Sequence, residues 1–299
     1  MNCMPTLDPR IFTDAPPETF ESMYREGYAD VSGVRLHYTD WNPSGERTIV
    51  LVHGLNVQLH TWDPIAAALS ADWRVICFDN RGHGDSSWGA DYWLKSFVND
   101  LDGLVTQLGL TKFALVGHSL GARITLAYAG EHPDRVTHVV LSDTGPEVAK
   151  SAAKYMQAVI GGAADVRGFK DEAHAAEVFR GQNPEWREVY IGLHARHQLR
   201  RSWAGKLVLK SDPELFWLTG GAGLKDNAYV WEMAAKITAP TLVMWGERSL
   251  FLDQELADRL LATLQHGELV RIASGHFIPR EEPEAFVDAL RSFLERRPR

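Results

Sequence analysis

The chain of 299 residues contains only two cysteines, Cys3 and Cys77, and it has no apolar run long enough to cross a membrane. Cys77 lies in the apolar segment 75–78, which has the pattern of a buried strand, so we expect no disulfide to Cys3. The first twenty residues hold acidic side chains and prolines instead of the apolar core of a signal peptide. These absences predict a protein of the reducing cytoplasm without a membrane-spanning segment.

An excess of positive charge is also missing, since 31 Lys and Arg stand against 39 Asp and Glu and give a formal net charge of -8. An acidic protein does not attract phosphate backbones or anionic lipids, so nucleic-acid and membrane partners are not expected. The expected partner is a small-molecule substrate. The sequence does not distinguish a monomer from a homodimer.

Short apolar segments alternate with amphipathic ones over most of the chain, which is typical of a mostly parallel sheet covered by helices on both faces. Two segments around Ser32-Gly33 predict an antiparallel hairpin before this alternation begins. We expect strands at 48–52, 74–78, 113–116, 136–141, 241–245 and 268–272, and helices at 62–69, 97–108, 122–132, 254–264 and 283–296.

Changes in this pattern divide the chain into three parts. Residues 1–25, which are rich in proline, are expected to form an N-terminal arm that lies over the domain without being a core element. Residues 26–144 and 237–299 are expected to form the α/β core domain. Between them the alternation stops, and residues 145–236 are predicted to form an inserted helical cap, or lid.

The strongest local signal is the run Gly117-His118-Ser119-Leu120-Gly121, which follows an apolar strand and precedes an alanine-rich helix. A sharp turn from strand to helix exposes the Ser119 hydroxyl, and glycine is needed on both sides because a Cβ would collide with the neighbouring strand or helix. The helix N-terminus also favours developing negative charge. The run therefore predicts a nucleophilic serine.

With this motif the chain resembles the α/β-hydrolase superfamily from about residue 28 to 296, in its serine hydrolase, esterase-like branch with a helical cap. Residues 51–55, Leu-Val-His-Gly-Leu, are similar to the family's His-Gly motif at a strand end, and residues 79–86, Asp-Asn-Arg-Gly-His-Gly-Asp-Ser, are similar to its turn after the next strand. The resemblance implies the α/β-hydrolase fold, with a mostly parallel eight-stranded sheet flanked by helices. It also implies an oxyanion hole formed by the backbone N–H groups of Leu55 and Leu120.

A nucleophilic serine needs a base, and His276 lies just past the last apolar strand, where this family places it. Families of this fold commonly place the acid after the seventh strand, but residues 246–249 read Gly-Glu-Arg-Ser and lack an Asp. Some hydrolases of this fold take the acid from the end of the sixth strand, which is Asp143 here, and they often have Ser after strand seven. Asp143 is therefore the favoured acid, and Glu247 and Asp253 are the alternatives.

The predicted activity is cofactor-free hydrolysis of a small carboxylic ester or lactone through an acyl-enzyme intermediate. Haloalkane dehalogenases and soluble epoxide hydrolases share the fold but use an Asp nucleophile, so Ser119 argues against both. The first alternative is a hydrolase of a C–C or amide-type bond in a ring-cleavage product of aromatic or heteroaromatic catabolism. The alternative of another class is a non-catalytic ligand-binding receptor, which the intact nucleophile and base disfavour.

Aromatic and basic side chains in the expected cap are candidates for substrate contact. The basic ones belong to the stretch 194–206, which is able to bind a substrate carboxylate, although a solvated helix face is the more common meaning of such a stretch. His194 and His197 lie three residues apart, but no carboxylate or thiol cluster accompanies them, so no metal site is predicted. The candidates for substrate contact are Trp203, Trp217, Trp231, Arg200 and Arg201.

Overall fold

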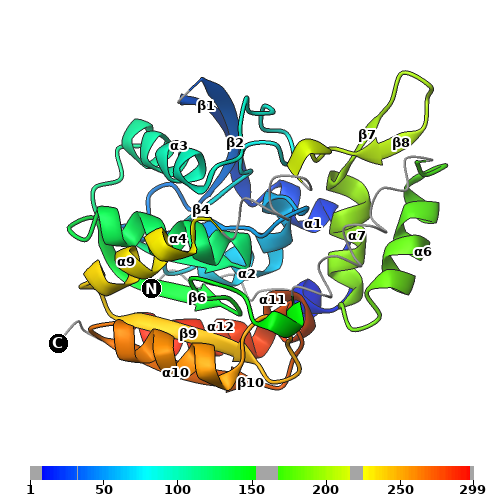
Figure 1. The fold of residues 1–299 in the computed structure, drawn as a ribbon. Coiled ribbons are helices and arrows are strands. Elements are labelled where there is room, and N and C mark those ends of the chain that lie inside the picture. The colour runs from blue at the N-terminus through cyan, green and yellow to red at the C-terminus, as the bar shows by residue number, and fades with distance from the viewer. Residues whose placement is uncertain (1–8, 32, 153–167, 216–224, 297–299) are drawn as a thin grey trace, which may run out of the picture.

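The computed structural model describes residues 9–31, 33–152, 168–215 and 225–296, which are built around one eight-stranded sheet (Figure 1). The strand order is β1-β2-β4-β3-β5-β6-β9-β10. The β1–β2 and β2–β4 pairs are antiparallel and the other five are parallel, so the prediction of a mostly parallel eight-stranded sheet is confirmed. The strands are β1 Tyr24–Val31, β2 Val34–Trp41, β3 Thr48–Val52, β4 Arg74–Phe78, β5 Phe113–His118, β6 Val136–Ser142, β9 Thr241–Gly246 and β10 Gly267–Ile272.

Helices pack on both faces of this sheet because each presents an apolar stripe to it. In the last helix the buried positions Phe286, Leu290 and Phe293 recur at helical spacing. One apolar cluster joins the sheet to α3, α4 and α10, and a second joins it to α2 and α12. The helices of the core are η2 Leu59–Trp62, α2 Asp63–Leu69, α3 Leu94–Gln107, α4 Leu120–Glu131, α10 Gln254–Thr263, α11 Ile278–Glu281 and α12 Pro283–Leu294.

Each predicted strand and helix is present, with ends that differ by no more than three residues. The predicted hairpin is also present, since Val31 pairs with Val34 across a two-residue connection in which Gly33 has φ +79°. Among the described residues no helix is long and apolar enough to cross a membrane. Cys77 is buried and free, as expected for its place in β4.

The N-terminal segment contributes to the core, contrary to the expectation of an arm that only lies over it. It contains η1 Pro9–Phe12 and α1 Glu18–Glu21, and β1 begins before residue 25. Phe20 is completely buried, and Ile11 is almost completely buried in the same apolar cluster as Trp41 and Trp62. Pro9 and Pro17 stand at the starts of these two short helices, and the apolar residues Ile11 and Phe20 cover large aromatic side chains that would otherwise face water.

The described part of the chain between β6 and β9 contains both helices and strands. It contains α6 Glu172–Gln182, α7 Glu188–His197, α9 Asn227–Lys236 and a hairpin of β7 Leu199–Arg201 and β8 Leu207–Leu209. The basic stretch 194–206 is therefore divided between α7 and the hairpin, whose turn uses Gly205 at φ +78°. It does not form one helix face, because this turn reverses the chain.

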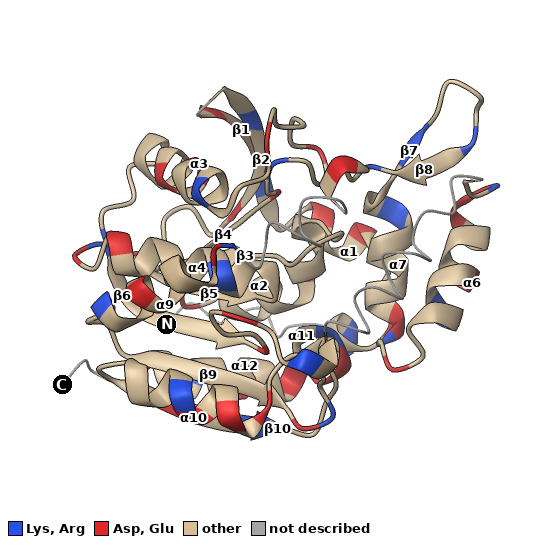
Figure 2. Ribbon diagram, viewed as in Figure 1, with Lys and Arg blue, Asp and Glu red and all other residues tan. Residues whose placement is uncertain are grey.

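These elements occupy two places in the molecule. The helices α6 and α7 and the β7–β8 hairpin lie together at the right of Figure 1, whereas α9 lies against α4 of the core. A Cβ on Gly130 of α4 would overlap the backbone of Met233 in α9, so these two helices are in close contact. Acidic and basic positions are interspersed over the elements in the view of Figure 2.

The burial of Phe20 predicts that this N-terminal residue stabilises the whole domain. Phe20→Ala should lower the free energy of unfolding by about 3 kcal/mol or more, because it removes a fully buried ring and leaves a cavity. Trp203→Ala is the control, since that side chain is 100% exposed and its loss should change stability by less than about 0.5 kcal/mol. Urea denaturation measures both, and equal effects would contradict a core role for the segment.

Candidate active site

Ser119 stands in a strained turn between β5 and α4. Its backbone has φ +55°, a region that residues with a side chain rarely adopt. A Cβ on Gly117 would overlap the carbonyl oxygen of Gly121, and a Cβ on Gly121 would overlap that of Val52 in β3. The close approach of β3, β5 and α4 therefore requires glycine on both sides of Ser119, and the turn holds the serine at the helix N-terminus.

Two unpaired backbone N–H groups lie near Ser119. The loop after β3 passes directly against the serine, since a Cβ on Gly54 would lie 3.1 Å from the Ser119 Cβ. Leu55 is the next residue of that loop, and Leu120 is the first residue of α4. Neither N–H group donates a hydrogen bond to another residue that the structure describes. Both are thus available to an oxygen atom bound beside Ser119, as an oxyanion hole requires.

His276 and Asp143 form a hydrogen-bonded pair. The distance between His276 Nδ1 and Asp143 Oδ2 is 2.7 Å. Asp143 is completely buried at the end of β6, with φ +56°. Its Oδ1 accepts the Gly246 N–H at 2.9 Å, and the Ser249 hydroxyl donates to its Oδ2. Three donors from the β9 end and the His276 loop therefore surround this carboxylate, and they fix the imidazole with Nδ1 toward the acid.

Burial determines the charge of this pair. It lowers the pKa of His276 to about 3, and the positive charge of Arg280 acts in the same direction. The imidazole is therefore neutral near pH 7, and with its Nδ1 proton donated to Asp143 it keeps a lone pair on Nε2. Burial raises the pKa of Asp143, while the hydrogen bonds from Ser249 and Gly246 oppose that shift. A neutral histidine with a free Nε2 is the form that serves as a general base.

Neighbouring rings fix the position of His276. The His118 Nε2 lies 2.9 Å from the His276 carbonyl oxygen, so the residue before the serine is bonded to the base. The Phe251 ring stacks on the imidazole with centroids 3.6 Å apart and an interplanar angle of 13°. No hydrogen bond joins Ser119 Oγ to His276 within the described part of the chain, and this contact is often long in ligand-free sites.

Neither alternative acid forms a hydrogen bond or ion pair with the imidazole among the contacts of the described residues. Glu247 is exposed, and the Asp253 side chain caps α10 by accepting the Leu256 N–H at 2.9 Å. Sequence reasoning did not find Phe251, because no motif marks a ring in the loop after β9. Ser249 was noticed only as the residue that replaces an Asp, and the structure makes it a donor to Asp143.

The candidates for substrate contact have other surroundings, and no described contact joins them to the serine, the histidine or the acid. Trp203 is 100% exposed in the β7–β8 turn, Arg200 and Arg201 are exposed on β7, and Arg200 lies over the Trp88 ring. The Trp231 indole N–H donates to Glu147 at 3.0 Å. Substrate contact by these residues therefore stays a prediction, and Trp217 lies outside the described residues.

Two groups of described side chains are close enough to hold a metal ion, and neither includes Ser119, Asp143 or His276. They are His60, Asp63 and His197, and His37, Asp79 and Asp85.

The comparison with known proteins identifies the family of the fold. The family model for the alpha/beta hydrolase fold matches residues 47–283. The chain belongs to this family. A 3-hydroxybutyrate-oligomer hydrolase of Cupriavidus necator is 29% identical to this hydrolase over 81% of the chain and 87% of the relative. A soluble epoxide hydrolase of a Corynebacterium species is 25% identical over 89% of the chain and 96% of the relative.

The same fold is found in solved structures. The crystal structure of E-2-(acetamidomethylene)succinate hydrolase superposes on this hydrolase with a TM-score of 0.82 at 23% identity, covering 91% of this chain and 100% of that one. At this identity the likeness shows the fold alone.

The close approach at the Ser119 turn makes a glycine substitution a direct test of the geometry. Gly121→Ala should lower the free energy of unfolding by more than about 2 kcal/mol, because the new Cβ overlaps backbone oxygens of β3 that have no room to move. Gly181→Ala in α6 is the matched control: nothing lies within 4 Å of its Cβ position, so it should be neutral or stabilising. Urea denaturation of both variants measures this, and a tolerated Gly121→Ala would contradict the packing.

Proposed function

We propose that this hydrolase is a serine hydrolase that cleaves a small carboxylic ester or lactone through an acyl-enzyme intermediate. The observation that carries the proposal is the buried His276–Asp143 hydrogen bond beside a serine in a strained turn. No cofactor enters the proposed reaction.

The proposed reaction has two halves. Ser119 Oγ attacks the carbonyl carbon while His276 Nε2 takes its proton, and the N–H groups of Leu55 and Leu120 stabilise the oxyanion. The intermediate collapses, the C–O bond to the alcohol breaks, and His276 returns the proton to the leaving oxygen. A water molecule then attacks the acyl-enzyme with His276 as base, which releases the acid and restores Ser119.

The relatives support the chemistry at different levels. The 3-hydroxybutyrate-oligomer hydrolase acts, by its name, on an oligomer whose units are joined by ester bonds, which fits a serine esterase. The other relative is named as a soluble epoxide hydrolase, a class for which an Asp nucleophile is expected, and Ser119 argues against that chemistry here.

The alternative is hydrolysis of a C–C or amide-type bond in a ring-cleavage product. The hydrolase of E-2-(acetamidomethylene)succinate, which shares the fold, is named for a substrate that contains an amide. An acyl-enzyme on Ser119 can form by cleavage of either kind of bond. The two functions are therefore distinguished by the substrate that is cleaved and not by the catalytic residues.

Catalysis by this pair is tested with a series of p-nitrophenyl esters of increasing acyl length. Ser119→Ala and Asp143→Asn should each lower kcat by about a thousandfold or more, because one removes the nucleophile and the other the group that orients the base. Asp253→Asn and Glu247→Gln are matched controls on the alternative acids and should leave kcat nearly unchanged.

The outcomes separate the possible readings of the site. An active Asp143→Asn together with an inactive Asp253→Asn or Glu247→Gln would reassign the acid. Wild-type protein that ignores esters but cleaves amide-type ring-cleavage products would favour the alternative function. If the wild-type protein turns over neither class of substrate but binds a ligand, the proposed enzymatic function is wrong and the receptor alternative is favoured.

The pH profile tests the neutral state of His276. Since kcat/KM rises as pH increases through the pKa of the free base, and burial lowers that pKa, the acid limb should lie well below the ordinary histidine value of about 6.5. Phe251→Leu should move the limb to higher pH, because loss of the stacked ring admits water to the imidazole. Steady-state kinetics over roughly pH 4 to 8 measure the acid limb of the wild type and of the variant. A wild-type limb near the ordinary histidine value of about 6.5 would contradict the neutral state of His276.

A further inference from the structure

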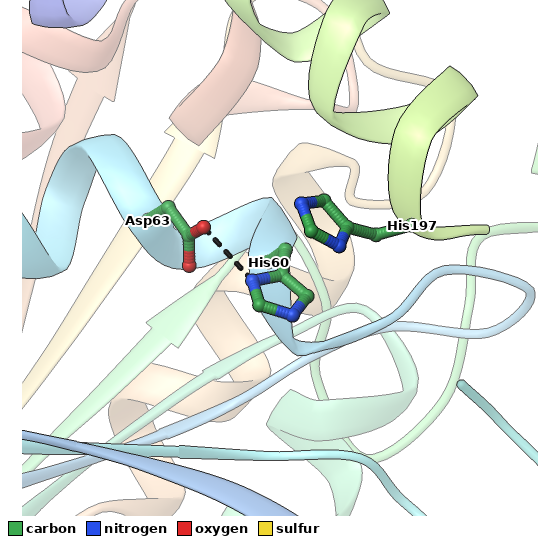
Figure 3. Close-up of side chains that lie close together, drawn as sticks. All are labelled: His60, Asp63 and His197. Atoms are coloured by element: carbon green, nitrogen blue, oxygen red, sulfur yellow. Dashed lines mark hydrogen bonds and ion pairs between the residues drawn. The ribbon is translucent and has the colours of Figure 1, made fainter. Parts of the chain in front are cut away.

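A second group of titratable side chains lies apart from the proposed catalytic pair. His60 comes from η2, Asp63 from the first turn of α2 and His197 from the last turn of α7, and Figure 3 shows them facing one another. One potential ligand atom of each lies within 4.8 Å of the others. Because α7 and η2 are far apart in the sequence, only the fold brings these residues together.

Within the cluster, Asp63 orients His60 and His197 covers it. The distance between His60 Nδ1 and Asp63 Oδ2 is 2.9 Å, and the two imidazole rings stack with centroids 3.8 Å apart. His60 is 4% exposed and Asp63 is 1% exposed. The hydrogen bond holds His60 Nδ1 beside the Asp63 carboxylate, so an ion bound to both residues would take the place of the proton between them.

Two polar atoms of the cluster are buried without a hydrogen-bond partner. They are the second carboxylate oxygen of Asp63, Oδ1, and the Nε2 atom of His197. Such atoms cost free energy unless a ligand satisfies them.

The other candidate cluster, His37 with Asp79 and Asp85, differs in this respect. The Asp79 oxygens accept the Leu59 N–H at 2.7 Å and the Asp85 N–H at 2.9 Å, and His37 Nδ1 lies 2.8 Å from Oδ2. Its ligand atoms are therefore already used to hold the turn after β4. The unsatisfied atoms distinguish the His60 cluster from this internal network.

A cavity of about 300 Å³ gives access to the two histidines. It is lined by Tyr24 and by three carboxylates, and its lining contains no lysine or arginine. Two of these carboxylates have cationic partners nearby, since Glu21 lies 3.5 Å from Arg196 and Asp85 2.5 Å from Lys210. The carboxylate of the third, Glu26, has His37 as its partner among the described side chains. An acidic cavity of this kind raises the local concentration of a small cation.

We propose that His60, Asp63 and His197 form a binding site for a divalent transition metal ion of the Zn²⁺ type. Two imidazoles and one carboxylate are a common ligand set for such ions. Metal–ligand bonds of about 2.1 Å place ligand atoms up to about 4.2 Å apart, so binding requires the stacked imidazoles to turn until their nitrogen atoms converge on the ion. Bound there, the ion links α7 to the η2–α2 segment.

The test is direct metal binding by the full-length protein without added histidines. After treatment with a chelator, Zn²⁺ is titrated calorimetrically at about pH 8, where an ordinary histidine is neutral, and Co²⁺ is titrated with detection of its visible absorption. One ion per chain should bind, and Zn²⁺ should raise the melting temperature because it binds only the folded state.

Variants locate the ion. His197→Ala and Asp63→Asn should each weaken Zn²⁺ binding by at least about tenfold and abolish the rise in melting temperature. The controls are His174→Ala, which removes an exposed histidine of α6, and His276→Ala, which removes the proposed catalytic base. Both should bind as the wild type does.

The melting temperature of each metal-free variant shows that it is folded. The proposal is overturned if the wild type binds neither ion, if His197→Ala and Asp63→Asn bind like the wild type, or if binding is lost only in His276→Ala, which would place the ion at the catalytic pair.

Discussion

The steric constraint at Gly117, Ser119 and Gly121 governs the rest of the site. Strand β5, strand β3 and helix α4 approach so closely that no Cβ fits at either glycine, and the serine between them takes a positive φ. This geometry places the side chain of Ser119 at the N-terminus of α4 and against the loop after β3. Everything that acts on the serine must therefore come from the same edge of the sheet.

A second residue with a positive φ, at the end of another strand, places the acid and the base at that edge. Asp143 follows β6 and also has a positive φ, and its carboxylate bonds to the backbone at the end of β9. Burying a carboxylate is costly unless donors surround it. The donors from Gly246, Ser249 and His276 are thus a condition for folding the site, and they fix the base in one orientation at the same time.

The success of each prediction from the sequence depends on how close together in the chain the residues that determine the feature lie. Strands, helices and the Ser119 turn depend on residues close together in the chain, and they were found within a few residues. The burial of Phe20 and the stacking of Phe251 on His276 depend on partners far along the chain, so no pattern marked them. His197 was considered only with His194, its neighbour in sequence, whereas the fold pairs it with His60.

The end of α7 connects the two polar sites. Gln198, which caps α7 and is completely buried, donates its Nε2–H to the carbonyl oxygen of Asn56 at 3.3 Å. Asn56 has φ +56° and follows Leu55 in the loop against Ser119. A strained loop keeps its shape only where its surroundings hold it. Since His197 stacks on His60 and Gln198 bonds to Asn56, the end of α7 packs against both η2 and the loop that contains Leu55, and it supports the shape of that loop beside Ser119.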